Sequence, residues 1–356
     1  MDSIRLQKLR AVCAQHQLDA FLATRPLSLH YLLGFSGSSG VGLITDTAVY
    51  FITDFCYKEQ ALIEVPADRI IQAAGTLLEE LNTIPKFRRL KTIGFEADYL
   101  TVSNFEHFKK IAHFAQLVPL TDTIETIAAQ KSTEEAELIR KACDITVSVF
   151  QEVCNVIQAG VTEQDIATEI SYKIRRYGGD GDAFEPVVLF GKNSAYPHGK
   201  PGGTKLSKRD IVQLDLGAVY KGYCADFSRI VFMGKPSRQL LALYQVVKEA
   251  QDKALSVCTA GIPANEIDTA ARSVIEKAGY GAYFGHSIGH GLGLNVHMVP
   301  KISPKNSAPV HSDTIFTIEP GIYLPGVGGV RIEDVVYIQD TNVYVLTKSS
   351  RDPIIL

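Results

Sequence analysis

Two copies of one helical segment, 101 residues apart, restrict the fold of this chain more than any other feature. The first copy, AGVTEQDIATEISYKIRRYGG, begins at Ala159, and the second, AGIPANEIDTAARSVIEKAGYG, begins at Ala260. Both open with Ala-Gly, and Gly178 near the end of the first aligns with Gly279 in the second. Each copy follows a longer helical pattern and precedes apolar, strand-like segments, so the order of elements repeats too. This predicts a duplicated domain of two α-α-β-β halves.

The region before the duplication has a different pattern. Short apolar runs such as GVGLITDTAVYFITD alternate with helical stretches such as IRLQKLRAVCAQH, which predicts an α/β domain. Ser132 followed by Glu135 is then a capping-box signal at the start of a long helical pattern that we expect to stop near Gly160. We therefore predict an α+β chain of two domains, residues 1–125 and 126–356.

Composition excludes several classes of partner. Lys and Arg number 36 against 39 Asp and Glu, with no long basic run, so we expect no nucleic acid partner. The chain has no signal-peptide pattern at its start and no apolar run near the roughly 20 residues that cross a bilayer, so we expect no membrane partner. Its six cysteines contain no CxxC pair, which favours buried thiols in a reducing cytoplasm over a disulfide framework or a zinc cluster. The predicted location is cytoplasmic.

Four carboxylates fall on apolar strand-like segments of the duplicated domain. If residues 219–222 form a hairpin loop, Asp215 and Asp226 lie directly opposite each other, with their Cβ atoms about 5 Å apart. Glu319 and Glu333 flank a Gly- and Pro-rich turn in nearly the same way. Removing an ion from water costs several kcal/mol unless something compensates it. A bound cation therefore explains two symmetric acid pairs better than solvent-facing strands do.

The segment FGHSIGHGLGLNVHMVP, residues 284–300, contains His286, His290 and His297. Carboxylates alone suit Ca²⁺ or Mg²⁺, whereas one imidazole shifts the preference toward Mn²⁺, Fe²⁺, Co²⁺ or Zn²⁺. The first two histidines have the spacing of a zincin helix, but the Glu of HExxH is missing and the glycines disfavour a helix. We expect a loop wrapped around a site, and the spacing alone leaves open which histidine is a ligand.

Together, QLDLGA, ADFSR, HSIGHGLGLNVH, TIEPGIY and GVRIEDVV resemble the pita-bread metallopeptidase family, specifically its Xaa-Pro branch of prolidases and aminopeptidases P. The resemblance covers about residues 130–350. The earlier segment LHYLLGFSGSSGVGLIT is similar to the creatinase-type amino-terminal domain of that branch. The resemblance thus implies a creatinase-type α/β domain followed by a pita-bread catalytic domain, and a homodimer.

The resemblance also implies a pair of divalent metal ions. Asp215 would chelate one ion, Asp226 and Glu333 would bridge the two, and His290 and Glu319 would complete the second ion's ligands. Manganese(II) is favoured by the carboxylate-rich set, with Co(II), Zn(II) or Fe(II) as alternatives.

Further roles follow from the same resemblance. Glu319 would take a proton and return it to the leaving proline nitrogen. His198, in YPHGKP, and His297 would hold the substrate carbonyl and stabilise the tetrahedral intermediate, while His286 would line the pocket for the penultimate proline. Arg331, two residues before Glu333, would hold a carboxylate in place or orient the site.

The implied reaction is metal-dependent hydrolysis of the bond between an amino-terminal residue and a penultimate proline, in a dipeptide or in a longer proline-containing peptide. The alternatives are a methionine aminopeptidase-like enzyme, which normally lacks the creatinase-like domain, and a non-catalytic pita-bread binding protein, which generally lacks some ligands. One departure from the branch is Met298, which stands where an acid usually follows His297, so a hydrogen bond that orients this histidine is predicted to be missing. Tyr323 matches a family position near the active site, but an aromatic residue in a strand is more often a packing residue, so Tyr323 is left out of the predicted catalytic set.

Overall fold

The computed structural model describes residues 4–356, and the chain divides into two compact units, Met1–Ala128 and Ala129–Leu356. The first unit is built on a six-stranded mixed sheet with the strand order β4-β3-β2-β1-β5-β6. Its strands are β1 (Ala20–Ala23), β2 (Gly40–Thr45), β3 (Val49–Thr53), β4 (Arg69–Gln72), β5 (Thr92–Glu96) and β6 (Gln116–Leu120). Its helices are α1 (Ile4–Gln15), α2 (Pro26–Leu33), α3 (Lys58–Glu64), α4 (Val102–Ile111) and α5 (Thr123–Ile127).

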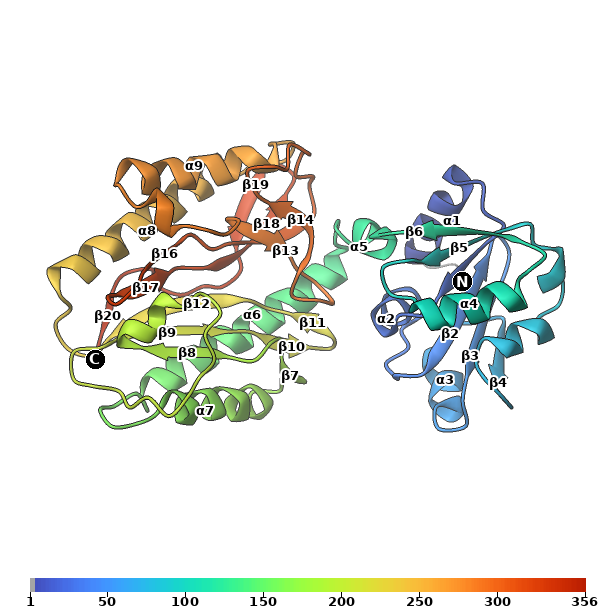
Figure 1. Cartoon of the computed structure of the whole chain (residues 1–356), viewed down its shortest axis with the longest axis horizontal. Coiled ribbons are helices and arrows are strands. Elements are labelled where there is room, and N and C mark those ends of the chain that lie inside the picture. The colour runs from blue at the N-terminus through green and yellow to red at the C-terminus, as the bar shows by residue number, and fades with distance from the viewer. Residues whose placement is uncertain (1–3) are drawn as a thin grey trace. The chain divides into compact units, whose positions relative to one another are not determined.

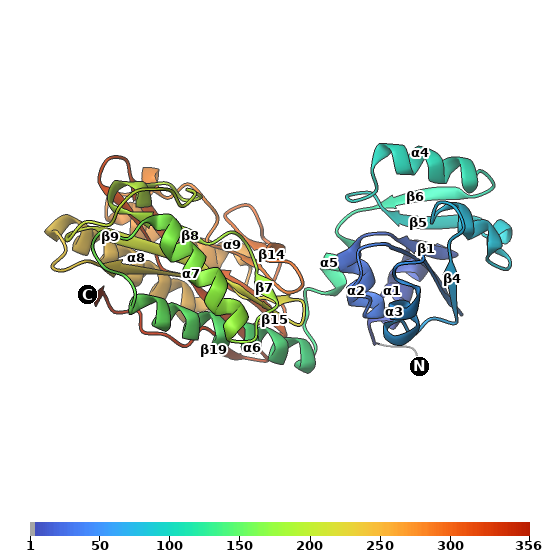
Figure 2. The same ribbon diagram turned by 90° about the horizontal axis from the view of Figure 1, so that it is seen from below.

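Helices cover both faces of this sheet, with α4 on one side of the strands and α1, α2 and α3 on the other (Figure 2). One face packs Leu22, Leu43 and Ile93 against Phe108 of α4. On the other face, Gly42 leaves room for Leu29 and Leu33 of α2, because a Cβ atom at Gly42 would lie 3.3 Å from each of them. The α/β architecture predicted for the amino-terminal region is confirmed.

A buried acid of this unit makes its stability depend on pH. Glu96, at the end of β5, accepts hydrogen bonds from the backbone N–H of Thr24 and Arg25 and from the Ser28 hydroxyl, yet burial outweighs them and raises its pKa. The folded state therefore binds the Glu96 proton more tightly than the unfolded state does, so ionisation of Glu96 costs stability as the pH rises through this pKa. Urea unfolding of wild type and Glu96→Gln at several pH values should show the glutamine variant gaining relative stability from acid to neutral pH. A pH-independent difference would contradict this expectation.

The second unit has the predicted repeat. Its helices are α6 (Thr133–Cys154), α7 (Glu163–Arg176), α8 (Arg238–Val257) and α9 (Ala264–Lys277). Each half contributes one long helix followed by a 14-residue helix, and α7 and α9 are 101 residues apart, as the sequence alignment predicts. The paired glycines Gly178 and Gly279 both adopt positive φ, at 90° and 84°, just after these helices. The duplication is thus present in backbone conformation as well as in sequence.

Strands fill the space between the helices, with α8 and α9 above them and α7 below in Figure 1. A four-stranded sheet has the order β20-β12-β9-β8, a five-stranded sheet the order β14-β13-β15-β18-β19, and smaller sheets pair β11-β10-β7 and β16-β17. Their bounds are β7 (Gly181–Asp182), β8 (Val187–Phe190), β9 (Ile211–Leu216), β10 (Ala218–Tyr220), β11 (Tyr223–Cys224), β12 (Phe227–Phe232), β13 (Gly289–Gly291), β14 (Met298–Ile302), β15 (Thr314–Ile318), β16 (Gly321–Leu324), β17 (Gly328–Arg331), β18 (Asp334–Gln339), β19 (Asn342–Val345) and β20 (Ile354–Ile355).

Each helix pair has its own apolar core. Helices α6 and α7 pack on β8, β9 and β12, and helices α8 and α9 pack on β15 to β18. Ile230 and Phe232 of β12 belong to the second core, so this strand joins the two halves. The capping box predicted at the start of the long helix is present, with Ser132 and Glu135 bonded reciprocally. Within residues 4–356, no helix is both long and apolar enough to cross a bilayer.

The predicted register of the first hairpin is wrong by two residues. Tyr220 pairs with Tyr223, so the turn consists of Lys221 and Gly222, both with positive φ, rather than of four residues. Positive φ at both central positions is typical of a two-residue hairpin turn whose twist matches the strands. Asp215 consequently pairs with Ser228 instead of Asp226. Because side chains alternate between faces, Asp215 and Asp226 still share one face, as diagonal neighbours.

Candidate metal centre

Five side chains converge where strands of the two halves end. Asp215 lies on β9, and Asp226 precedes β12 by one residue. His290 is the central residue of the short strand β13. Glu319 follows β15 and Glu333 precedes β18; the register of the flanking pairs, Ile318 with Asp334 and Gly321 with Arg331, places these two glutamates across from each other. The symmetric pairs predicted from the sequence thus meet in space.

The distances define one cluster. Ligand atoms of Asp226, His290 and Glu333 all lie within 4.8 Å of one another. His290 Nε2 is 3.7 Å from Asp226 Oδ2 and 3.3 Å from Glu319 Oε1. Asp215 is hydrogen-bonded to Arg331: Nη2 of the arginine donates to Oδ2 of Asp215 at 2.6 Å. The structure therefore brings together all five residues that the sequence resemblance named as ligands.

The charges of this cluster are not balanced by the protein. Asp215, Asp226 and Glu333 are only 8%, 5% and 1% exposed. Burial, followed by the charges of neighbouring acids, raises the pKa of Asp226 and of Glu333 well above its ordinary value. Among the described residues, Asp215 Oδ1 and Glu333 Oε1 are buried without a hydrogen-bond partner. Divalent cations fit this set, because they would supply both the missing charge and the missing partners.

His290 has the tautomer that a metal ligand needs. Its Nδ1 lies 3.2 Å from the carbonyl oxygen of Gly291, and since a carbonyl only accepts, Nδ1 is the donor. Nε2 then faces the acids with its lone pair whenever the ring is neutral. Burial opposes the charged ring, but the hydrogen bond and the charge of Glu319 outweigh it and raise the pKa of His290. Reciprocally, burial favours neutral Glu319, but His290 lowers the pKa of this acid.

Glycines on both sides of His290 allow the strand to enter a crowded space. A Cβ atom at Gly289 would lie 1.8 Å from the backbone oxygen of Thr317, and one at Gly291 would lie 2.2 Å from that of Val299. Backbone atoms cannot give way as the end of a flexible side chain can. The sequence correctly predicted that the glycines exclude a helix here, and the structure adds that they bring His290 close to its neighbours.

Gly289→Ala is therefore expected to destabilise the protein by about 3 kcal/mol, because the new methyl group forces strands β13 and β15 apart. The measurement is the free energy of unfolding in urea. Gly285→Ala is the matched control in the same segment, since a Cβ atom there has nothing within 4 Å. Equal stability of the two variants would contradict the steric argument.

A hydrogen-bonded chain leads from the acids to a second histidine. Arg331 donates to Asp215 and, through Nη1, to the Tyr323 hydroxyl at 2.8 Å, and this hydroxyl lies 3.0 Å from His286 Nε2. His286 Nδ1 donates to the carbonyl of Ser287, so Nε2 accepts the tyrosine proton. Burial lowers the pKa of His286 and raises that of Tyr323 to about 12. Tyr323, left out of the catalytic set predicted from the sequence, therefore links Arg331 to His286 and does more than pack.

The remaining predicted histidines lie near the same cluster. The ring of His297 is 4.4 Å from that of His290, centroid to centroid, and burial lowers its pKa. His198 follows Pro197, whose carbonyl accepts a hydrogen bond from Arg331 Nη1 at 3.2 Å, so the arginine anchors the backbone of the His198 loop. Met298, at the position where an acid was expected, is buried on β14.

A duplicated α/β fold with buried acids and a histidine between its halves defines a protein built to hold divalent cations. Comparison with known proteins agrees. Residues 137–340 match Metallopeptidase family M24, and residues 5–127 match the Creatinase/Prolidase N-terminal domain. The chain therefore belongs to metallopeptidase family M24 and carries the amino-terminal domain of creatinases and prolidases. Membership in this family implies a divalent metal.

Full-length relatives include two solved structures. The Xaa-Pro dipeptidase from Bacillus anthracis is 35% identical, with a TM-score of 0.95 and 99% of each chain covered. The X-Pro aminopeptidase from Thermotoga maritima MSB8 is 34% identical, with a TM-score of 0.91 over 98% of this chain and all of that one. The Xaa-Pro dipeptidase of Pyrococcus furiosus is 33% identical over 98% of this chain and 99% of its own length.

Proposed function

We propose that this protein is a dinuclear metal-dependent Xaa-Pro exopeptidase of the aminopeptidase P or prolidase type. The observation that carries the proposal is the cluster of four acids and His290, three of them within 4.8 Å of one another and two with unpartnered buried oxygens. The names of the full-length relatives point to Xaa-Pro bonds as the substrate class.

Five residues are proposed to hold the metal: Asp215, Asp226, His290, Glu319 and Glu333. When bound, two divalent cations would supply Lewis acidity that activates water and polarises a carbonyl. Manganese(II) suits a set dominated by carboxylates with a single imidazole. The homodimer and the cytoplasmic location expected from the sequence stay predictions.

Glu319 is the proposed proton carrier. Its lowered pKa keeps it ionised at neutral pH, as a general base requires, and the Thr317 hydroxyl donates to its Oε1 at 3.2 Å. It takes a proton from the attacking water and returns it to the proline nitrogen as the bond breaks. His297, close to His290, would donate to the developing oxyanion.

Recognition of proline needs a pocket, because the proline nitrogen has no hydrogen that a backbone acceptor could bind. His286 supports one wall of it. Its ring is neutral at neutral pH, since burial lowers its pKa, and it lies edge-on to Phe284 and tilted against Tyr323, with centroids 5.0 and 5.6 Å away. Such an uncharged aromatic surface suits the apolar prolyl ring. His198, on the loop anchored by Arg331, is proposed to border the same space.

The proposal is tested by incubating the manganese-loaded protein with an Ala-Pro dipeptide, an Ala-Ala dipeptide and a pentapeptide with proline second. We expect release of the amino-terminal residue from proline substrates only. The ratio of the hydrolysis rates of the Ala-Pro dipeptide and the pentapeptide separates a dipeptidase from an aminopeptidase. Hydrolysis of Ala-Ala at an equal rate would refute the proline pocket, and no hydrolysis by metal-loaded protein would favour a binding protein.

His297→Ala should keep its metal and lose most of its turnover. Because His297 is proposed to act on the oxyanion and not as a ligand, kcat is expected to fall about 100- to 1,000-fold, as for loss of one oxyanion donor. Metal analysis and steady-state kinetics provide the measurement. Loss of metal from this variant would instead make His297 a ligand.

A further inference from the structure

Helix α8 contains a glutamine on a face that is otherwise apolar. Gln251 is 0% exposed, like Val247, Ala250 and Ala254 around it on the helix. Burying an amide is costly unless its donors and acceptor are satisfied. The Gln251 amide must therefore be satisfied by hydrogen bonds within the protein.

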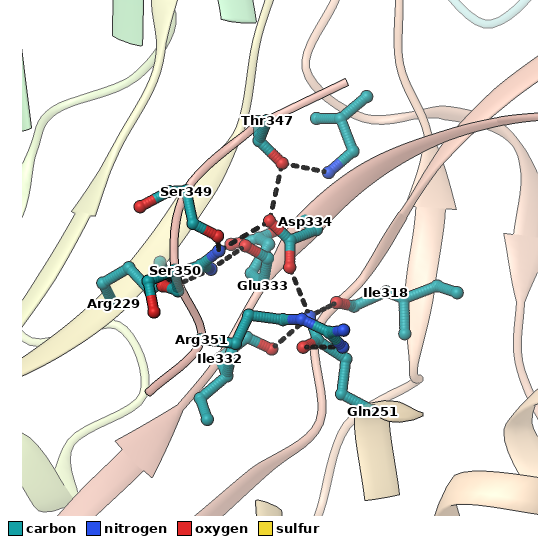
Figure 3. A network of polar contacts seen from close by, with 12 residues as sticks. Arg229, Gln251, Ile318, Ile332, Glu333, Asp334, Thr347, Ser349, Ser350 and Arg351 are labelled. Atoms are coloured by element: carbon teal, nitrogen blue, oxygen red, sulfur yellow. Dashed lines mark hydrogen bonds and ion pairs between the residues drawn. The ribbon is translucent and has the colours of Figure 1, made fainter. Parts of the chain in front are cut away.

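The amide nitrogen of Gln251 faces three acceptors that belong to the metal-centre strands. Nε2 is 3.2 Å from the carbonyl oxygen of Ile318, 3.3 Å from that of Ile332 and 3.0 Å from Asp334 Oδ2 (Figure 3). On the other side of the amide, Oε1 accepts from Arg351 Nη1 at 3.4 Å. Gln251 thus spans two chain segments that lie 14 residues apart in sequence.

These two carbonyls stand directly before Glu319 and Glu333. The sheet ladder is interrupted at this point, because Ile318 pairs with Asp334 in β15-β18 and the next regular pair is Gly321 with Arg331 in β16-β17. Across the gap the two glutamates lie outside the strands. Within the gap the backbone N–H of Ile332 donates to the Pro320 carbonyl at 3.3 Å, and Gln251 adds a side-chain bridge between the same two segments.

The third acceptor is itself held rigidly. Asp334 Oδ1 accepts from Arg229 Nη2 at 2.8 Å and from the Thr347 hydroxyl at 2.7 Å. Arg229 Nη1 also donates to the carbonyl of Glu333 at 2.7 Å. Figure 3 shows Arg229 and Gln251 reaching Asp334 from different directions. Gln251 is therefore attached to a fixed point and has little freedom to move.

We propose that Gln251 is a positioning residue that sets the separation of Glu319 and Glu333 and thereby the affinity of the site for its metal ions. The inference rests on the proposed function, in which both glutamates are ligands. Gln251 touches neither carboxylate. It binds the backbone carbonyl of the residue before each glutamate. It thus resembles the outer residues of metal sites, which hydrogen-bond to the ligands and orient them.

The test is manganese binding by chelator-stripped protein, measured by titration calorimetry. Gln251→Met keeps the length and apolar bulk of the side chain and removes both the NH2 group and the oxygen of the amide. We expect manganese to bind about 10- to 100-fold more weakly, the range found for partners behind metal ligands, and excess manganese to restore most of kcat with KM unchanged. Val247→Ala is the control, since it also removes buried contacts of α8, one turn away, without touching the two carbonyls.

Weaker binding in Gln251→Met with wild-type affinity in Val247→Ala would support the inference. Wild-type affinity in Gln251→Met, or equal weakening in both variants, would overturn it and leave the metal site intact. Failure of the wild-type protein to bind manganese would overturn the proposed function as well. If Gln251→Met does not fold, Gln251→Asn is judged by the same criteria, since its amide is one methylene too short to reach both carbonyls.

Discussion

Glu333→Gln is expected to lose its metal and its peptidase activity together. Glu333 is 1% exposed, and its Oε1 has no partner among the described residues, so a neutral amide there removes a charge that nothing else replaces. Metal catalysis supplies several kcal/mol of stabilisation to the transition state, and each 1.4 kcal/mol is a factor of ten. We therefore expect hydrolysis of an Ala-Pro substrate to fall at least about 1,000-fold.

Metal analysis by mass spectrometry and rate assays on the same preparation check this prediction. Glu96→Gln is the matched control, because it makes the same change at another buried acid, in the amino-terminal unit, and should keep wild-type metal content. Treating the wild-type protein with a chelator should reproduce the loss, and manganese should reverse it. Full activity in metal-free Glu333→Gln would contradict the assignment of Glu333 as a metal ligand.

Asp334→Ala is expected to produce the largest loss of stability. Asp334 and Arg229 are 0% and 1% exposed at the side chain and form an ion pair of 2.8 Å. Removing the acid leaves a guanidinium buried without its counter-charge, which typically costs about 3–5 kcal/mol. Domains usually have only about 5–15 kcal/mol in total, so the variant should be close to unfolding at moderate temperature.

Urea unfolding followed by circular dichroism is the measurement, because the chain has no tryptophan to report by fluorescence. A chelator in all samples keeps metal binding out of the comparison. Glu185→Ala serves as the control, because it breaks an exposed ion pair. The side chains of Glu185 and Lys200 are 64% and 82% exposed. The variant should change the free energy of unfolding by less than about 1 kcal/mol. Similar losses of unfolding free energy in both variants would show that burial of the Arg229–Asp334 ion pair does not determine its contribution to stability.

Much of the fold follows from local sequence. Ser132 and Glu135 predict a helix start, because a capping box is satisfied within one turn of chain. The repeat aligns Gly178 with Gly279, and both adopt a positive φ that few other residues tolerate. The two similar segments that begin at Ala159 and Ala260, 101 residues apart, predict the duplication itself. None of these inferences requires contacts between distant residues.

The five proposed metal ligands were also predicted from the sequence, but from motifs and not from geometry. The pairing of Asp215 with Asp226 was predicted by counting loop residues, and the count failed because Lys221 and Gly222 close a tighter turn. The two acids remained on one face only because the error was an even number of residues. A shift of one residue would have separated them.

What the sequence by itself determined are the helices, the duplication, the family motifs and the residue types able to hold a cation, all of which depend on neighbours along the chain. Only the tertiary structure decided that Tyr323 connects Arg331 to His286 and that Gln251 spans the carbonyls before Glu319 and Glu333. A tyrosine on a strand and a glutamine in a helix look like ordinary packing and surface residues. Their partners are 8 to 81 residues away in sequence, and a hydrogen bond between such groups exists only once the strands have been brought together.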